Sequence, residues 1–211
     1  MPSTRDRSLS AALQLLASGG MRALTHARVD AEAGLPRGST SNHFRTRQAL
    51  IEGVIERLVR SDYAEWLLTY EWGEPSVERF CAAIEAAVDS MTGTGREQTL
   101  ARYALVLEGT HNPSVAAAIQ EGRDRLRSWA VSAVAGLGVS GPEARAFALF
   151  AFIDGVVLQR LSAPSEGQST EGPSNEGEPD EGEPGEGEPR EGRVGDAVDV
   201  GLTVRRMLAE G

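Results

Sequence analysis

Apolar residues recur along most of this chain with the spacing of an α-helix. The first such run stops at Gly19-Gly20 and consists of Leu9, Ala12, Leu13 and Leu16. These positions follow the i, i+3, i+4, i+7 pattern, which places their side chains on one helix face. Stretches that alternate apolar and polar residues, the signal of a β-strand, are almost absent. The sequence therefore predicts an all-α fold of about nine helices.

Capping residues mark where several of these helices begin. Thr25 and Thr46 suit the N-cap position, where a side-chain oxygen accepts a hydrogen bond from the first turn. Asn112 is a third N-cap, and Pro113 after it occupies the first helical position, which tolerates proline. The predicted helices are short before residue 44 and long after residue 46. We therefore predict a small head at residues 1–46 and a larger body at residues 47–211.

The charge is distributed unevenly along the chain. The whole chain has a net charge of −10, yet residues 1–60 carry nine Arg against five acidic residues. Residues 61–160 carry eight Arg against thirteen acidic residues. A basic head on an acidic body indicates a local surface that binds the phosphates of a nucleic acid.

Residues 163–193 differ in composition from the rest of the chain. They lack any large apolar side chain, and they contain a five-residue repeat whose copies end at Pro179, Pro184 and Pro189. Such a segment cannot bury enough apolar surface to offset the conformational entropy that ordering it would cost. We therefore predict a disordered, acidic loop at residues 163–193, within the body.

Residues 25–50 combine three features in a fixed order. A helix ends in Ala33-Gly34, a short turn follows, and the next helix ends in the aromatic Phe44. A basic residue, Arg47, and the pair Ala49-Leu50 then open a long helix. This segment resembles the signature of the TetR family of transcriptional regulators. The resemblance implies a helix-turn-helix head for DNA and an all-helical body for ligand binding and dimerisation.

One face of the predicted recognition helix suits the major groove of DNA. Thr40 and Phe44 lie four residues apart and are expected to face the core of the head. The opposite face is then small, polar and basic. The N-termini of the flanking helices are suited to phosphates. The predicted DNA-binding residues are Thr25, Arg28, Arg37, Ser39, Ser41, Asn42, His43 and Arg47.

Two residues depart from the family pattern. Ser41 stands where such proteins usually carry Tyr, a residue that often touches the DNA backbone. Asp30 stands where a small apolar residue is usual. Two interpretations of Asp30 are open at this point: it pairs with an Arg within the head, or it is more exposed than its position in the helix indicates.

The body contains aromatic and apolar residues that suit either a hydrophobic core or the wall of a ligand cavity. The resemblance implies such a cavity without showing which residues line it. Arg102 and Glu108 are candidate polar anchors, or an ordinary ion pair. The predicted ligand-binding residues are Trp66, Met91, Tyr103, Leu107, Trp129, Phe147 and Phe150.

The predicted helix at about 142–161 is apolar on nearly all sides between Ala146 and Leu161. A helix without a polar face is buried on several sides, and soluble monomers rarely expose a large apolar patch. We therefore predict a two-fold homodimer built on this helix and on a last helix at about 194–209, with Val157 in the interface. Asp154 is expected to pair, with Arg205 or Arg206 as candidates.

Other chemistry is not indicated. The three histidines have no ligand spacing with Cys81, the single cysteine, so we predict neither a metal site nor a disulfide. We expect no cofactor and no enzymatic activity. No apolar run reaches the length of a membrane span, and residues 1–16 lack the pattern of a secretory signal, so we expect neither a membrane span nor secretion. The sequence predicts a cytoplasmic protein.

The leading hypothesis is a ligand-responsive transcriptional regulator. It would repress genes by binding a palindromic operator in double-stranded DNA, and a small apolar or amphipathic effector would release it. The alternative is an all-helical ligand-binding or enzymatic protein whose head no longer binds specific DNA. Its sequence support is the absence of Tyr at position 41.

Overall fold

The structure, a computed structural model, describes residues 2–69, 75–163 and 198–209, and all of their side chains except those of residues 62–69. These residues form nine helices and no strand, as predicted. In chain order the helices are α1 (Thr4–Ala23), α2 (His26–Glu32), α3 (Ser39–His43), α4 (Arg47–Thr69), α5 (Val77–Thr92), α6 (Arg96–Gly109), α7 (Pro113–Gly136), α8 (Pro142–Ser162) and α9 (Val200–Ala209). The predicted loop at residues 163–193 lies, after Ala163, outside the described residues.

The predicted helix starts are confirmed where N-caps were expected. Thr25 accepts a hydrogen bond from the backbone of Arg28, and Asn112 accepts one from the backbone of Val115. Thr46 likewise accepts from the backbone N–H of Ala49 at 3.0 Å. The predicted stop at Gly19-Gly20 is only partly confirmed, because the φ of 60° at Gly20 interrupts α1 but the helix resumes and ends at Ala23.

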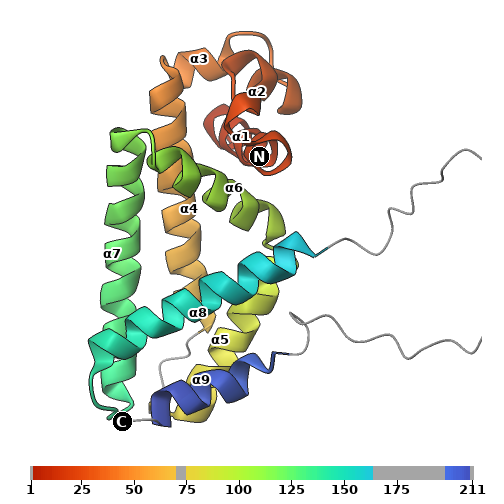
Figure 1. Ribbon diagram of the computed structural model, residues 1–211. Coiled ribbons are helices and arrows are strands. Elements are labelled where there is room, and N and C mark those ends of the chain that lie inside the picture. The colour runs from red at the N-terminus through yellow and green to blue at the C-terminus, as the bar shows by residue number, and fades with distance from the viewer. Residues whose placement is uncertain (1, 70–74, 164–197, 210–211) are drawn as a thin grey trace, which may run out of the picture.

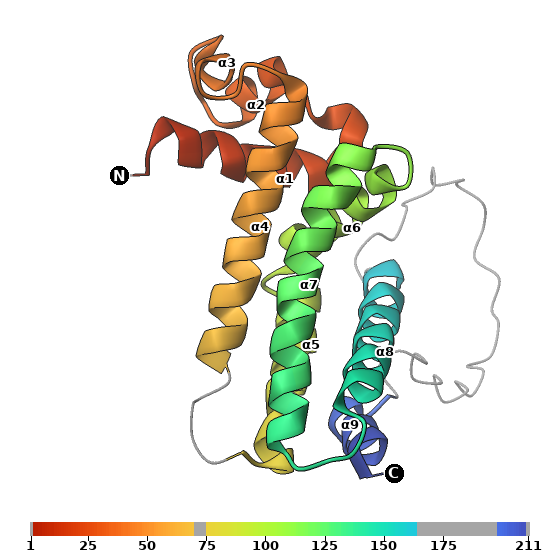
Figure 2. The same cartoon turned by 90° about the vertical axis from the view of Figure 1, so that its left-hand side faces the viewer.

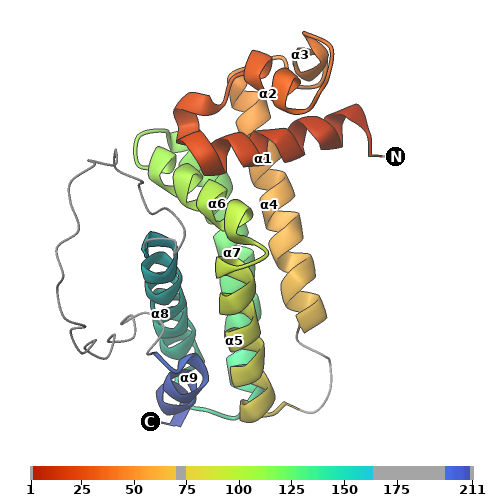
Figure 3. The same cartoon turned by 90° about the vertical axis from the view of Figure 1, so that its right-hand side faces the viewer.

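The head lies at one end of an elongated body (Figure 1). Helices α1 to α3 gather at that end, and α4 leads from them along the body beside α7 (Figure 2). Helix α1 packs against α6, which places α6 directly below the head (Figure 3). Helices α8 and α9 lie on the side of the body opposite α4 (Figure 2), and both pack against α5.

Two hydrophobic clusters stabilise this arrangement. The first joins the head to α4, α6 and the start of α7, through buried residues that include Leu16, Val54 and Leu105. The second joins α5, α7, α8 and α9. The hydrophobic core of the head therefore continues past residue 46 into the body. Because this core is close-packed, a displacement of α4 or α6 would shift the residues of the head that pack against them.

The burial of α8 corrects one expectation. Val157 is fully buried within its own subunit, in the second cluster, and so does not form an intersubunit surface. The exposed apolar side chains of α8 are instead Phe147 and Leu158. Within this chain α8 is buried along one face, whereas the face that carries Phe147 and Leu158 is exposed, so the predicted burial on several sides is not seen in the single chain. No helix in the described ranges combines the length and hydropathy that crossing a membrane requires.

Candidate DNA-binding head and ligand cavity

The turn between α2 and α3 is built from two glycines with left-handed backbone. Gly34 has a φ of 58° and Gly38 a φ of 89°, conformations that residues with a Cβ adopt only with strain. They turn the chain sharply enough to place α3 across the end of α2. Thr40 and Phe44 then point inward and are buried, as predicted.

Asp30 holds the start of α3. Its Oδ2 accepts a hydrogen bond from the backbone of Gly38 at 2.7 Å. Its Oδ1 accepts from the backbone N–H and the hydroxyl of Thr40 at 2.8 and 2.6 Å. Because the N-cap residue Gly38 has no side chain, the carboxylate of Asp30 takes over the role of a cap. We name the contacts among Asp30, Gly38 and Thr40 the Asp30 clamp.

Asp30 is neither paired with an Arg nor exposed, so both interpretations left open by the sequence are replaced. The residue is 3% exposed. Burial by itself would raise the pKa of this carboxyl, but the hydrogen bonds from Thr40 and Gly38 outweigh it and lower the pKa below its ordinary value. Asp30 is therefore an ionised, fully hydrogen-bonded group inside the head at neutral pH.

The outer face of α3 is polar and open. Arg37, Ser41, Asn42 and His43 are all exposed. Ser39 is half-buried, and its hydroxyl donates to the carbonyl of Pro36 at 2.6 Å. The structure thus brings five of the eight predicted DNA-binding residues onto one surface at the end of the molecule.

The remaining three predicted residues flank this surface. Thr25 and Arg28 lie in the first turn of α2, and both are exposed. Arg47 lies at the start of α4, where its guanidinium donates to the carbonyls of Met21 and Leu24 at 2.8 and 3.3 Å. Arg47 therefore stabilises the C-terminal end of α1, a contact that the sequence alone did not indicate.

A cavity of about 1480 Å³ opens among α4 to α8. Five of the seven predicted ligand-binding residues line it: Met91, Tyr103, Trp129, Phe147 and Phe150. Leu107 does not line it, because its side chain points to solvent and is 68% exposed. The side chain of Trp66 is outside the described residues.

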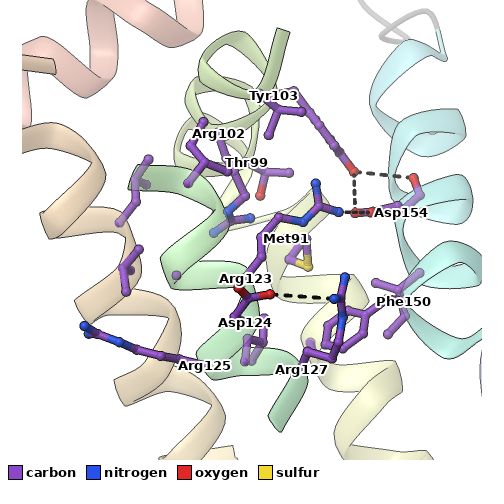
Figure 4. A pocket seen from close by; sticks show the side chains of 18 of the residues that line it. Met91, Thr99, Arg102, Tyr103, Arg123, Asp124, Arg125, Arg127, Phe150 and Asp154 are labelled. Carbon is purple, nitrogen blue, oxygen red and sulfur yellow. Dashed lines mark hydrogen bonds and ion pairs between the residues drawn. The ribbon is translucent and has the colours of Figure 1, made fainter. Parts of the chain in front are cut away.

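A polar cluster stands in the wall of this cavity (Figure 4). The hydroxyl of Tyr103 on α6 donates to the backbone and side-chain oxygens of Asp154 on α8, at 3.4 and 3.5 Å. Arg123 on α7 donates to the same carboxylate at 3.2 Å. Desolvation and the nearby negative charge of Asp154 raise the pKa of Tyr103 to about 12. The expected pairing of Asp154 with the last helix is wrong, since Arg205 pairs with Glu78 instead.

Sequence comparison decides the family of this protein. A model of the bacterial regulatory proteins of the tetR family matches residues 9–54, and a model of the tetracyclin repressor-like C-terminal domain matches residues 75–178. The chain belongs to the TetR family. It is a DNA-binding transcriptional regulator of the ligand-responsive kind. TetR-family regulators are not enzymes, which rules out the enzymatic alternative.

Solved structures support the same fold. A transcriptional regulator from Rhodococcus sp. Rha1 superposes with a TM-score of 0.67 at 21% identity, over 77% of this chain and 86% of that one. A candidate regulator from Saccharomonospora viridis, solved in complex with choline, gives a TM-score of 0.68 at 20% identity, over 77% and 87%. The multidrug binding protein EbrR, complexed with ethidium, gives 0.59 at 22% identity, over 75% and 88%. No curated protein matches the chain.

Within this TetR-family chain, sequence reasoning missed two groups of residues. Arg102 was expected as an anchor and does line the cavity, but Arg123 and Asp154 were not expected there. The region of α7 around Arg123 reads as an ordinary charged helix, because Asp124, Arg125 and Arg127 surround it. The role of Asp30 was also missed, because its hydrogen-bond partners Gly38 and Thr40 lie eight and ten residues away along the chain.

Proposed function

We propose that this TetR-family protein is a repressor that leaves its operator when a small amphipathic molecule fills the cavity. The proposal is carried by residues that belong both to the hydrophobic core of the head and to the wall of the cavity. Ile55, Leu58 and Leu105 belong to the hydrophobic cluster of the head and also line the cavity. A ligand that displaces them acts on the head through contacts that are already close-packed.

The choline and ethidium complexes of the similar proteins support an effector of small-molecule size. A ligand releases the operator only to the extent that it binds the DNA-incompetent conformation more tightly. Movement of α6, which packs against α1, would change the position of the head relative to the body. We further propose that the protein works in the cytoplasm, where bacterial DNA lies.

We propose a homodimer that binds a palindromic operator through the two recognition helices. Among the described residues, the large apolar side chains left exposed are Leu107, Phe147, Leu158 and Leu202. Three of these four lie on α8 and α9, which together would form a four-helix bundle with a second copy. Two of them, Phe147 and Leu158, also line the cavity, so that the proposed interface adjoins the ligand site on α8. Two-fold symmetry of the protein requires two-fold symmetry of the operator.

In each half-site, we propose that Arg37 reads a guanine and that Asn42 contacts an adenine or a phosphate. We assign phosphate contacts to Thr25, Arg28, Ser39, Ser41 and His43. Arg47 is assigned to the same role through those N–H groups of its guanidinium that do not donate to α1. The head at residues 1–46 is then the DNA-binding part and residues 47–211 form the part that binds ligand and the second subunit.

Replacing Arg37 with Ala is expected to weaken operator binding by about 1–3 kcal/mol per half-site and to relax the preference at one base pair. Replacing His43 with Ala should weaken binding to all sequences alike, because a phosphate contact carries no sequence information. Fluorescence anisotropy with the upstream region of the protein's own gene measures both effects. Arg125→Ala, a change at an exposed side chain of α7 outside the head and the proposed interface, is the control. Unchanged affinity in both head variants would refute the assigned face.

A further inference from the structure

Helix α3 is too short to be stable by itself. It has five residues, whereas an isolated helix in water needs about 12–15 residues to form. Contacts from its neighbours must therefore fix both of its ends, and the Asp30 clamp fixes only the first. A helix also leaves the carbonyl oxygens of its last turn without a partner inside the helix, so the end at Phe44 requires a donor from elsewhere.

His26 supplies that donor. It opens α2, which packs against α3 (Figure 1). The Nε2 atom of His26 lies 2.6 Å from the carbonyl oxygen of Phe44, in a partly buried contact. A carbonyl oxygen can only accept a hydrogen bond, so this nitrogen must carry a proton. Because His26 lies four residues before Asp30, on the same side of α2, one side of that helix holds α3 at both ends.

The side chain of Phe44 attaches the same point of the chain to other helices. Its ring is buried, and a Cβ on Gly53 of α4 would come within 2.6 Å of the ring atom Cε1. The guanidinium of Arg5 on α1 lies over the ring, 5.5 Å from its centre. The ring thus ties the end of α3 to α1 and α4, whereas the bond from His26 ties it to α2. Without that bond, the end of α3 would follow α4 when α4 moves relative to α2.

We propose that His26 is a positioning residue for DNA recognition, which holds the end of α3 against α2 and does not itself contact DNA. This inference rests on the proposed DNA-reading face of α3, and His26 is not among the eight residues assigned to DNA. Base contacts need donor and acceptor atoms at hydrogen-bond distance, whereas phosphate contacts bind every sequence. Loss of the contact is therefore expected to reduce discrimination between sequences rather than overall binding.

Fluorescence anisotropy on the full chain tests this with two labelled duplexes, the upstream region of the protein's own gene and a scrambled duplex of the same length and composition. His26→Phe keeps a ring but has no donor. It is expected to bind the upstream duplex about tenfold more weakly per half-site, as for the loss of one partly buried hydrogen bond, with unchanged affinity for the scrambled duplex. His26→Gln places an amide N–H near the position of Nε2 and should restore the affinity to within about threefold.

Two further variants serve as controls. His111→Phe makes the same change at an exposed histidine outside the head and should leave both affinities unchanged. His26→Asn carries an amide that is too short to reach the Phe44 carbonyl, so it should behave like His26→Phe. It replaces the aromatic variant if circular dichroism shows that His26→Phe has lost helix content. A parallel loss of affinity for both duplexes in folded His26→Phe would indicate a direct phosphate contact and overturn the proposal, as would a Gln variant that binds no better than the Phe variant.

Hydrogen exchange of the DNA-free chain, followed by mass spectrometry, gives a second readout. Exchange in residues 39–46 should be faster in His26→Phe, with little change in α1, and unchanged exchange in residues 39–46 contradicts the proposed contact. Arg37→Ala on the same duplexes tests the DNA-reading face separately. A loss of operator affinity in Arg37→Ala without a loss in His26→Phe rejects the positioning role alone, whereas unchanged affinity in Arg37→Ala rejects the face on which that role rests.

Discussion

A chain in which Asp30 is replaced by Ala is expected to bind its operator about a hundredfold more weakly than the unchanged protein. The substitution removes the acceptor of three hydrogen bonds and leaves the buried backbone N–H of Thr40 and the partly buried N–H of Gly38 without this partner. An orphaned buried donor costs about 1–3 kcal/mol, so loss of both bonds to Thr40 and of the partly buried bond to Gly38 should cost the start of α3 about 3 kcal/mol of local stability. Such a loss corresponds to about a hundredfold in affinity, provided that α3 must be ordered to bind.

Simple electrostatics predicts the opposite sign for this variant. Removal of a negative charge from a DNA-binding head should strengthen binding, because fewer charges repel the phosphates. Glu32→Ala makes the same charge change at an exposed position of α2 and is the matched control. Asp30→Asn keeps one acceptor and should fall between the two. Anisotropy with a labelled operator, together with urea unfolding, measures all three; equal operator affinity for Asp30→Ala and Glu32→Ala would contradict the role of the Asp30 clamp.

The Asp30 clamp also has a defined pH dependence. The pKa of Asp30 is lower in the folded head than the ordinary value of 3.8, so the folded form holds the proton less tightly than the unfolded form. The stability that the ionised carboxylate contributes is therefore complete above pH 3.8 and is lost as the pH falls below this value. At neutral pH the head should be insensitive to small pH changes at this residue.

The parts of the fold that the sequence predicted are those fixed by local physics. Thr25, Thr46 and Asn112 start helices because an N-cap acts within one turn, and the inward direction of Thr40 and Phe44 follows from helical spacing. The glycine turn before α3 is equally local. These features are sufficient to recognise the head, and with it the family.

The parts that the sequence could not predict depend on which distant residues meet. The role of Asp30 could not be predicted from the sequence, because only the turn between α2 and α3 brings its partners, Gly38 and Thr40, close to it. Asp154 was assigned to the last helix because that helix and the one carrying Asp154 were expected to meet in a dimer interface, whereas the folded chain places Arg123 and Tyr103 beside it. Periodicity predicts which face of a helix is buried, but not which helix covers it.

The observed burial of α8 also changes which variant can test the proposed dimer. Val157 is fully buried in the second hydrophobic cluster, so an Arg there would place an unpaired charge in the core and prevent folding. Loss of operator binding in that variant would therefore say nothing about assembly. A test of the interface needs a residue whose side chain is apolar, exposed and on the helices proposed to meet.

Leu202→Arg on α9 is expected to convert the dimer into a folded monomer and to weaken operator binding by about a hundredfold or more, because two linked half-site contacts become one. The side chain of Leu202 is 45% exposed, so an Arg there is tolerated in the monomer but is desolvated in a four-helix bundle. Leu107→Arg is the matched control: the same change on α6, at a side chain that is 68% exposed and outside the proposed interface. Sedimentation velocity at micromolar concentration should show dimers for the unchanged chain and for Leu107→Arg, and monomers for Leu202→Arg. A stable monomer in the unchanged chain, or a dimer that survives Leu202→Arg, would place the interface elsewhere.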